Sequence, residues 1–365
     1  ASGPLYCRGP RNGTPPPRQQ PRPSPTTGQS PLFSRHGVTL DNTHQAERPT
    51  GQPSMLNWIP QDWNVSSPLT EGTFFWTDQL WRGGYRLQSH CAGESWRVVC
   101  PRGMRQTTGS EATCLEAFDR LAGPPPHYTP GDHIVVLLHG LLRTRRCMKP
   151  LGASLTKVGL GPVIRPDYAS SRLPIRAHAA ALRRLVDGLA GEPKLSFVGH
   201  SMGNIVLRHA IGDWIRDNDP RGVLKRMRRV VMLGPPNQGA AIARQLSRIG
   251  LFHLVAGDGG MELGPDWESL RPRLATPPCP FAVVAGDLTP YWANNPLIQG
   301  ANDFLVSVDE AKLPGATDFV TMHIPHATLM YDARVHKYVI EFIDRDDPAA
   351  ALPTLTNGTR IPTQP

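Results

Sequence analysis

The sequence lacks any long apolar run. No stretch of its 365 residues approaches the ~18–20 consecutive apolar residues that a membrane-spanning helix needs. Its amino-terminal region also lacks the charged segment, apolar core and small-residue cleavage site of a signal peptide. We therefore expect no transmembrane segment, and a cytoplasmic location is slightly favoured while the compartment stays open.

Cysteine is scarce, and its spacing argues against the common metal motifs. The six cysteines form no Cys-x-x-Cys pair and no other metal-ligand spacing, so we expect neither a metal nor a cofactor. Cys91 and Cys100 flank a candidate hairpin, which leaves a disulfide open for an exported protein. Buried free thiols are the favoured interpretation.

Proline, in contrast, is abundant and unevenly placed. Residues 1–54 hold eleven of the 39 prolines, and their six arginines against two acidic residues give +4 of the chain's net +9. With almost no apolar periodicity, this segment cannot bury enough surface to offset its ordering entropy, so we predict that it is disordered. It lacks interleaved aromatic residues, and we expect no nucleic-acid partner.

The composition predicts four regions. Residues 1–55 form a disordered Pro/Arg-rich tail, residues 56–125 a small mixed N-terminal cap segment, residues 126–346 a catalytic domain, and residues 347–365 a disordered C-terminal tail. The cap segment holds five of the eight tryptophans, two short strands in "YRLQSHCAGESWRVV" and a helix in "SEATCLEAFDRLAG".

The region from His133 onward alternates between short apolar strands and amphipathic helices. "HIVVLLHG", "PKLSFVGH", "MRRVVMLG", "CPFAVVAG" and "ATDFVTMH" are typical of buried parallel strands. This alternation predicts an α/β fold with a mostly parallel sheet and helices on both faces. Catalytic residues of such folds lie beyond the carboxyl ends of the strands.

One serine stands at such an end. Gly199-His200-Ser201-Met202-Gly203 lies between a predicted strand and a predicted helix. This G-x-S-x-G context is that of a nucleophile elbow, in which a sharp turn exposes the serine at the edge of the sheet. We therefore predict that Ser201 is a nucleophile.

A reactive serine also needs an oxyanion site. "VVLLHGLL" places a glycine directly after an earlier strand, where a second backbone donor is expected. We predict that the backbone N–H groups of Leu141 and Met202 bind the substrate oxygen.

The base and the acid are expected later in the chain. His326 follows the last predicted strand and is favoured over His323, which lies on that strand, and over His336, for which a surface position on the closing helix is the default. Both Asp287 and Asp303 precede this histidine and can serve as the acid. Asp303 is favoured because the apolar "FLVS" after it would hold its loop against the core.

Four segments together carry a family resemblance: "VLLHGL", "GHSMGN", "LGPPNQG" and "NDFLVS…HIPHATLM". A fifth segment, "DYASSR", also contributes to this resemblance. From His133 to Arg345 the chain resembles an α/β-hydrolase of the lipase/esterase superfamily, nearest to bacterial serine lipases of the triacylglycerol-lipase type. The resemblance implies hydrolysis of carboxylic esters through an acyl-enzyme. It carries over onto the triad Ser201, Asp303 and His326 and the oxyanion donors Leu141 and Met202.

Several alternatives stay open. The same triad serves an acyltransferase or a thioesterase, and a non-catalytic binding module on the same scaffold is a third hypothesis. The expected partner is a small-molecule ester or lipid, with transient contact to a lipid surface; the oligomeric state stays open. The stretch between Gly239 and Pro280 is short for a large mobile lid.

Four cations follow the oxyanion segment within seven residues: Arg143, Arg145, Arg146 and Lys149. A solvated rim is the favoured interpretation. Steering of anionic substrates is the alternative hypothesis.

Overall fold

The computed structural model describes residues 73–246, 252–291, 293–345 and 358–360. The Pro/Arg-rich tail predicted for residues 1–55 lies outside these ranges. Of the predicted C-terminal tail, only Gly358–Arg360 is described, and these residues form a short strand.

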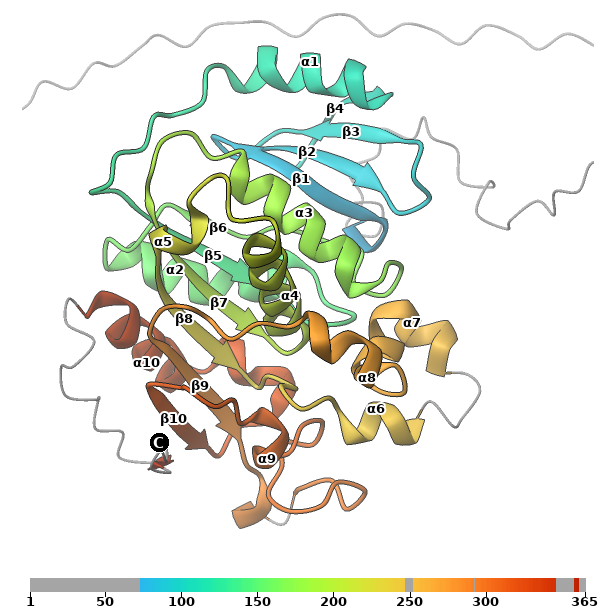
Figure 1. The fold of residues 1–365 in the computed structure, drawn as a ribbon, viewed down its shortest axis with the longest axis vertical. Coiled ribbons are helices and arrows are strands. Elements are labelled where there is room, and N and C mark those ends of the chain that lie inside the picture. Colours follow the sequence, from blue (N-terminus) through green and yellow to red (C-terminus); the bar gives the residue numbers. More distant parts are fainter. Residues whose placement is uncertain (1–72, 247–251, 292, 346–357, 361–365) are drawn as a thin grey trace, which may run out of the picture. The chain divides into compact units, whose positions relative to one another are not determined.

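The catalytic region is built on a seven-stranded sheet (Figure 1). Neighbouring strands in this sheet run parallel, except that the edge strand Gly358–Arg360 runs antiparallel to its neighbour. The predicted α/β architecture with a mostly parallel sheet is therefore confirmed. In spatial order the strands are β11 (Gly358–Arg360), β10 (Asp318–Met322), β9 (Phe281–Gly286), β8 (Met227–Leu233), β7 (Lys194–His200), β5 (His133–Leu138) and β6 (Val163–Ile164).

Helices cover both faces of this sheet, because side chains alternate between the faces along each strand. In β5, Ile134, Val136 and Leu138 pack into the cluster that includes the apolar sides of α3 and α4, whereas Val135 and Leu137 pack into the cluster that includes α2 and α10. The long helices are α2 (Lys149–Lys157), α3 (Ile175–Asp187), α4 (Met202–Arg216) and α10 (Ala333–Asp344).

The tryptophan-rich segment forms a second sheet with strands β1 to β4 in sequence order, all antiparallel. Helix α1 begins after Ser110, whose hydroxyl accepts the N–H of Thr113, and Phe118 on this helix is buried against Leu87 and Val98 of the sheet. The predicted hairpin and helix are confirmed, and two strands beside them were not predicted. The bounds are β1 (Trp76–Arg82), β2 (Tyr85–His90), β3 (Trp96–Val99), β4 (Arg105–Gly109) and α1 (Glu111–Ala122).

The hairpin register rules out the Cys91–Cys100 disulfide. Ser89 pairs with Trp96 at one end of the β2–β3 hairpin, and Arg86 pairs with Val99 at the other. Cys91 and Cys100 therefore lie at opposite ends of the hairpin, and both are free thiols. Cys100 is buried, as expected, whereas Cys91 is half-buried.

Shorter helices lie mainly in the loops beyond the carboxyl ends of the parallel strands, where Figure 1 shows α6, α7 and α8. Helix α7 is kinked at Gly257. The described residues contain no helix that is both long and apolar enough to cross a bilayer. The short helices are α5 (Val223–Arg226), α6 (Ala241–Leu246), α7 (Phe252–Leu263), α8 (Trp267–Leu270) and α9 (Val308–Ala311), and the 3-10 turns are Thr73–Phe75, Arg145–Met148, Arg271–Arg273, Thr289–Tyr291 and His326–Tyr331.

The packing of β7 generates a stability prediction. Phe197 on β7 has no exposed surface, whereas Ile215 on α4 is 51% exposed. Phe197→Ala leaves a cavity in the core, so we expect the free energy of unfolding, measured by urea denaturation, to fall by about 3–5 kcal/mol. Ile215→Ala is the control and should change it by about 0.5 kcal/mol or less. Equal effects of the two substitutions would contradict this account of the core.

Candidate active site

Ser201 occupies a tight turn between β7 and α4. Its backbone φ of 54° is unusual for a residue with a side chain. Two hydrogen bonds hold the turn: the N–H of Ser201 donates to Leu233 O of β8 at 2.9 Å, and Nδ2 of the buried Asn204 donates to Ser201 O at 3.0 Å. The side chain of Ser201 stays half-buried. The predicted strand–turn–helix context is therefore present.

Glycine at two neighbouring positions lets other backbone segments approach this turn. A Cβ at Gly203 would lie 2.7 Å from His139 O, and a Cβ at Gly140 would lie 2.9 Å from Ser201 Cβ. Both distances are shorter than real Cβ contacts. Larger residues at either position would push the loop after β5 away from Ser201.

The two predicted oxyanion donors flank this contact. Met202 is the first residue of α4, so its N–H has no intrahelical acceptor. Leu141 follows Gly140, the residue that lies against Ser201. The positive end of the α4 dipole also favours negative charge beside Met202.

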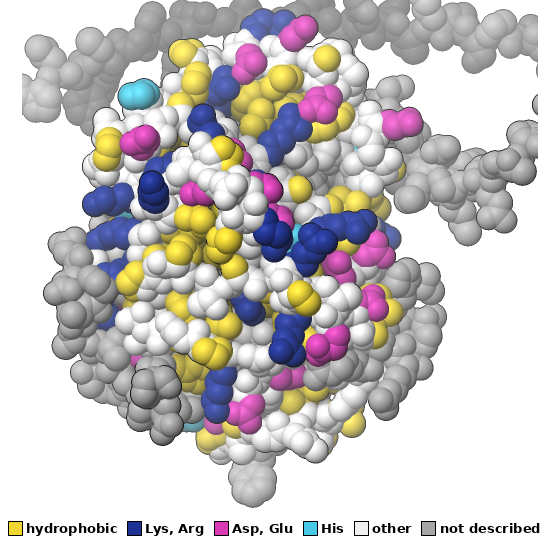
Figure 2. All heavy atoms as spheres, viewed as in Figure 1, with side chains coloured by type: hydrophobic (Ala, Val, Ile, Leu, Met, Phe, Trp, Pro, Cys, Tyr) yellow, Lys and Arg dark blue, Asp and Glu magenta, His cyan; other side chains and the backbone are white. Residues whose placement is uncertain are grey.

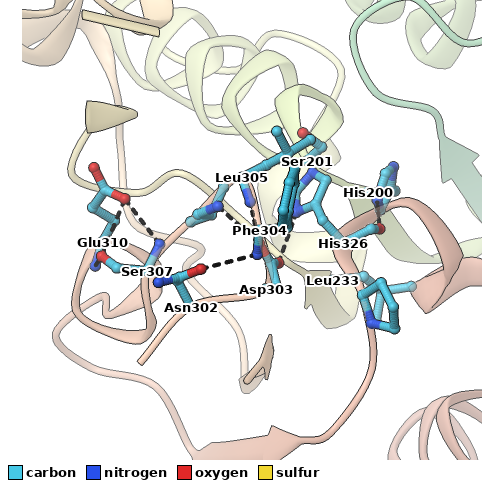
Figure 3. A network of polar contacts seen from close by, with 12 residues as sticks. His200, Ser201, Leu233, Asn302, Asp303, Phe304, Leu305, Ser307, Glu310 and His326 are labelled. Carbon is cyan, nitrogen blue, oxygen red and sulfur yellow. Dashed lines mark hydrogen bonds and ion pairs between the residues drawn. The ribbon is translucent and has the colours of Figure 1, made fainter. Parts of the chain in front are cut away.

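Asp303 and His326 form a buried pair (Figure 3). His326 Nδ1 lies 2.7 Å from Asp303 Oδ2, and the side chains are 5% and 1% exposed. The backbone N–H of His326 also donates to Asp303 O at 3.0 Å. Since Nδ1–H donates to the carboxylate, the neutral ring has a free lone pair on Nε2.

Glycines place this pair at the same sheet edge as the serine. A Cβ at Gly234, directly after β8, would lie 2.9 Å from His326 Nδ1, and a Cβ at Gly286, the last residue of β9, would lie 2.5 Å from Asp303 Cβ. Figure 3 draws Ser201 with the Asp303–His326 pair, and His326 O lies 3.0 Å from Nε2 of His200, the residue before Ser201. No hydrogen bond joins the hydroxyl of Ser201 to His326 among the described residues, and in unliganded sites such contacts are often long.

The alternative acid and bases have other partners. Asp287 Oδ1 accepts the N–H of Thr289 at 2.8 Å in a local turn, and Asp287 O lies 3.1 Å from His323 Nδ1. The surface position expected for His336 is wrong: this residue is 9% exposed, and its Nε2–H donates to Met330 O at 2.9 Å. It is buried because it lies on the side of α10 that faces α2, where its Nδ1 lies 3.0 Å from Ser154 Oγ.

The reason given for choosing Asp303 is only partly right. Val306 is buried, but Phe304 and Leu305 are 53% and 38% exposed, so the apolar run does not hold the loop against the core. Hydrogen bonds hold it instead. Asp303 Oδ1 accepts the N–H groups of Leu305 and Val306 at 3.0 and 2.8 Å, and the fully buried Asn302 accepts the N–H of Phe304 at 3.1 Å.

His200 has a place that the sequence did not reveal. It is buried, and its Nε2–H donates to His326 O at 3.0 Å, with the two rings 4.9 Å apart. Burial lowers the pKa of His200 well below its usual value. His200 therefore supports the backbone of His326 as a neutral ring. In the sequence, the histidine within the G-x-S-x-G motif is the feature that could have pointed to this supporting role.

His139, after β5, is likewise held neutral. Its Nδ1–H donates to Gly140 O at 3.0 Å and its Nε2 accepts the N–H of Tyr168 at 3.3 Å, while its ring stacks on Tyr168 at 3.9 Å. Burial lowers the pKa of His139 to about 4. A second proton on Nε2 would face the N–H of Tyr168, so this arrangement accepts only the neutral ring.

The cation cluster after this loop is not uniformly free to steer substrates. Arg145 Nε lies 3.1 Å from Oδ2 of the buried Asp167, and the Arg145 N–H donates to Oδ1 at 2.8 Å. This arginine is therefore a structural partner of Asp167. The described residues contain no cluster of three or more histidines, cysteines or acidic residues arranged to hold a metal ion.

Comparison with known families agrees with this geometry over part of the chain. Residues 176–235 match the family described as "Putative serine esterase (DUF676)". This segment contains β7, the turn at Ser201 and α4. No curated protein matches the chain. The match supports a serine hydrolase over this part of the chain.

Solved structures of low sequence identity are also similar. The mature lipase BlEst2 of Bacillus licheniformis has 19% identity and a TM-score of 0.41, with 57% of this chain aligned to 90% of the other. Phospholipase PlaB of Legionella pneumophila has 16% identity and a TM-score of 0.43, covering 59% of this chain and 60% of that one. The metagenomic carboxyl esterase MGS0156 has 17% identity and a TM-score of 0.39, covering 57% and 69%.

The close approach at Gly203 generates a prediction about the reactivity of Ser201. Gly203→Ala places a methyl group against His139 O, which displaces either the turn or the loop after β5. We expect labelling of Ser201 by a fluorophosphonate probe to slow by about 10²-fold, as for a lost oxyanion donor. Gly131→Ala is the matched control, because a Cβ there meets nothing closer than 3.7 Å. Labelling of Gly203→Ala at the control's rate would contradict the assignment.

The neutral state of His139 generates a pH prediction. The unfolded chain binds a proton on this residue near pH 6.5, whereas the folded chain does so only near pH 4. The unfolded state thus holds more protons between these values, and stability falls as the pH drops from 6.5 through 4 by an amount on the order of 3 kcal/mol. Urea denaturation across this range should show a flatter slope for His139→Asn than for the wild type. Identical slopes would contradict the prediction.

Proposed function

We propose that the chain is a carboxylic-ester hydrolase of the lipase/esterase type, in which Ser201, His326 and Asp303 form the catalytic triad. The observation that carries the proposal is convergence at one edge of the sheet. The buried His326–Asp303 pair reaches the turn at Ser201 through His326 O, which accepts the Nε2–H of His200 at 3.0 Å, and the loop that contains Leu141 reaches it through Gly140, which lies against Ser201 Cβ.

In the first half of the proposed reaction, the Ser201 hydroxyl attacks the acyl carbon of the ester. His326 Nε2 takes the hydroxyl proton, and the carboxylate of Asp303 stabilises the imidazolium through Nδ1–H. The negative oxygen of the tetrahedral intermediate accepts the N–H groups of Leu141 and Met202. When the intermediate collapses, the carbon–oxygen bond to the alcohol breaks, and the alcohol leaves with the proton from His326.

In the second half, water attacks the acyl-enzyme. His326 Nε2 removes a proton from the water, a second tetrahedral intermediate forms in the same oxyanion site, and its collapse releases the carboxylic acid. Ser201 regains its proton from His326. The protons and electron pairs balance without a metal or a cofactor.

The proposed substrate is a small-molecule ester or lipid, and no nucleic acid is expected. On the face drawn in Figure 2, lysine and arginine side chains are interspersed with acidic and apolar side chains rather than joined into one continuous basic surface. A continuous basic surface is what binding to a phosphate backbone favours.

The proposal predicts the kinetics of two variants. Ser201→Ala should lose hydrolysis of p-nitrophenyl esters and all labelling by a fluorophosphonate, because the nucleophile is absent. Asp303→Asn should keep its fold but lower kcat by about 10³–10⁴-fold, because the amide no longer orients the His326 tautomer. The measurement is a series of p-nitrophenyl esters from short to long acyl chains.

Asp287→Asn serves as the control for the acid and should keep wild-type kcat. Competing alcohol and thioester substrates in the same assay distinguish a hydrolase from an acyltransferase or a thioesterase. A wild-type chain that is neither labelled nor active on any ester would overturn the proposal.

A further inference from the structure

The segment Asp167–Ser171 joins three parts of the molecule. Its five residues are all buried, none with more than 7% of its surface exposed. It follows β6 and contains no helix or strand. The N–H of Ser170 donates to Tyr168 O inside the segment at 2.7 Å, whereas other hydrogen bonds join the segment to neighbouring elements and show what it supports.

One set of partners is the loop that contains Leu141. The hydroxyl of Tyr168 donates to His139 O, and Ser170 Oγ accepts the N–H of Leu142 at 3.1 Å. Asp167 Oδ1 accepts the N–H of Arg145 at 2.8 Å. The loop is thus held on both sides of Leu141.

The hydrogen bond from Leu142 matters because of the backbone conformation there. Leu142 has φ 55°, in the left-handed region that a leucine rarely adopts. Such a conformation persists only where surrounding contacts hold it. Ser170 supplies one of those contacts, one residue from the proposed oxyanion donor.

The second set of partners is the N-terminal sheet. The N–H of Asp78 on β1 donates to Asp167 O at 2.9 Å, and the N–H of Asp167 returns a bond to Asp78 Oδ2 at 2.8 Å. Thr77 Oγ1 accepts the N–H of Ala169 at 3.2 Å. Strand β1 therefore docks directly on the segment that holds the loop.

A buried arginine joins these two carboxylates. Arg86 Nη1 on β2 lies 3.1 Å from Asp167 Oδ2 and 3.6 Å from Asp78 Oδ1, with all three side chains at most 5% exposed. Burial raises the pKa of both Asp78 and Asp167, and the Arg86 guanidinium opposes this shift. Without that charge, Asp78 and Asp167 would remain close together with Arg145 as the remaining ion-pair partner of Asp167, and their mutual repulsion would favour protonation or movement of one carboxyl group.

The third partner is α7, at the other end of the segment. A Cβ at Gly257 would lie 1.9 Å from Ser171 O, and a Cβ at Gly259 would lie 2.9 Å from Ser170 O and 3.2 Å from Met202 Sδ. Helix α7 thus rests on the same segment and on the side chain of Met202, the second proposed oxyanion donor.

We propose that Ser170 is a positioning residue for the oxyanion site, and that the N-terminal sheet belongs to the catalytic machinery because Asp78 and Arg86 hold the Asp167–Ser171 segment beneath the loop of Leu141. This inference rests on the proposed ester hydrolysis. It assigns the sheet a role in lowering the transition-state barrier, beyond its contribution to stability.

The direct test is Ser170→Ala, assayed in the full-length chain with p-nitrophenyl acetate. The loop keeps both N–H donors but loses one anchor, so kcat should fall by about tenfold or more with KM within twofold, less than the loss of a whole donor. Ser171→Ala is the matched control, since its hydroxyl makes no hydrogen bond to the loop among the described residues. It should keep wild-type kcat and KM. Wild-type kcat in Ser170→Ala would overturn the positioning role.

The role of the sheet is tested by Arg86→Met against Arg82→Met. Arg82 lies on β1 and pairs with Asp119 of α1 at 2.9 Å, away from the loop. Both variants weaken the sheet, but only Arg86→Met should lower kcat, by about tenfold, at temperatures where thermal melting shows both to be folded. Equal kcat in the two would overturn the role of the sheet.

If Arg86→Met does not fold, a second pair of variants still tests the role of the sheet. Thr77→Val, an isosteric change, deletes only the acceptor of the Ala169 N–H, and Thr107→Val on β4 is its control. A lower kcat in Thr77→Val alone supports the inference, and equal kcat overturns it. A wild-type chain that lacks esterase activity instead overturns the proposed function, so the two failures are distinguishable.

Discussion

The turn at Ser201 is the constraint on which the rest of the site depends. A residue with a side chain is held there at positive φ, a conformation that costs about 1–3 kcal/mol and needs support from its surroundings. The N–H bond to Leu233 and the buried amide of Asn204 supply that support. Because β8 is the neighbour of β7 in the sheet, the turn is as firmly placed as the sheet itself. The loop after β5 approaches Ser201 at Gly140, where a Cβ would lie only 2.9 Å from Ser201 Cβ.

Two buried polar networks then set the loops around this turn. On one side, the carboxylate of Asp303 binds both His326 and its own loop, so the proposed acid and base form one unit. On the other side, the Asp167–Ser171 segment joins the loop after β5 to the N-terminal sheet. Burial makes an unpaired member of either network costly, and each network therefore has one well-satisfied arrangement. Neutral His139 and His200 fit the same principle, because each ring has its N–H on a carbonyl oxygen.

Much of this arrangement could be predicted from local pattern. Strand and helix periodicity predicted the parallel sheet and the helices α3, α4 and α10, whereas α2 was not predicted. The glycines around Ser201, between a predicted strand and a predicted helix, indicated the strand–turn–helix context. Prediction was weaker where a residue's neighbours come from far away in the chain. The apolar "FLVS" after Asp303 predicts an anchor in the core, yet Phe304 and Leu305 are exposed, and hydrogen bonds such as that from the Phe304 N–H to Asn302 hold the loop. The surface position of His336 was wrong for the same reason, since its burial depends on how α10 packs against α2.

The sequence by itself determined the type and order of the elements and the chemical identity of the candidate nucleophile, acid and base. These follow from period, glycine placement and chain order, which are properties of short segments. Only the tertiary structure decided that Asp303 rather than Asp287 meets His326, that Cys91 and Cys100 lie apart, and that a strand near residue 78 supports a loop near residue 141. Contacts of this kind depend on sheet order and hydrogen-bond register, which bring together residues that no local pattern relates.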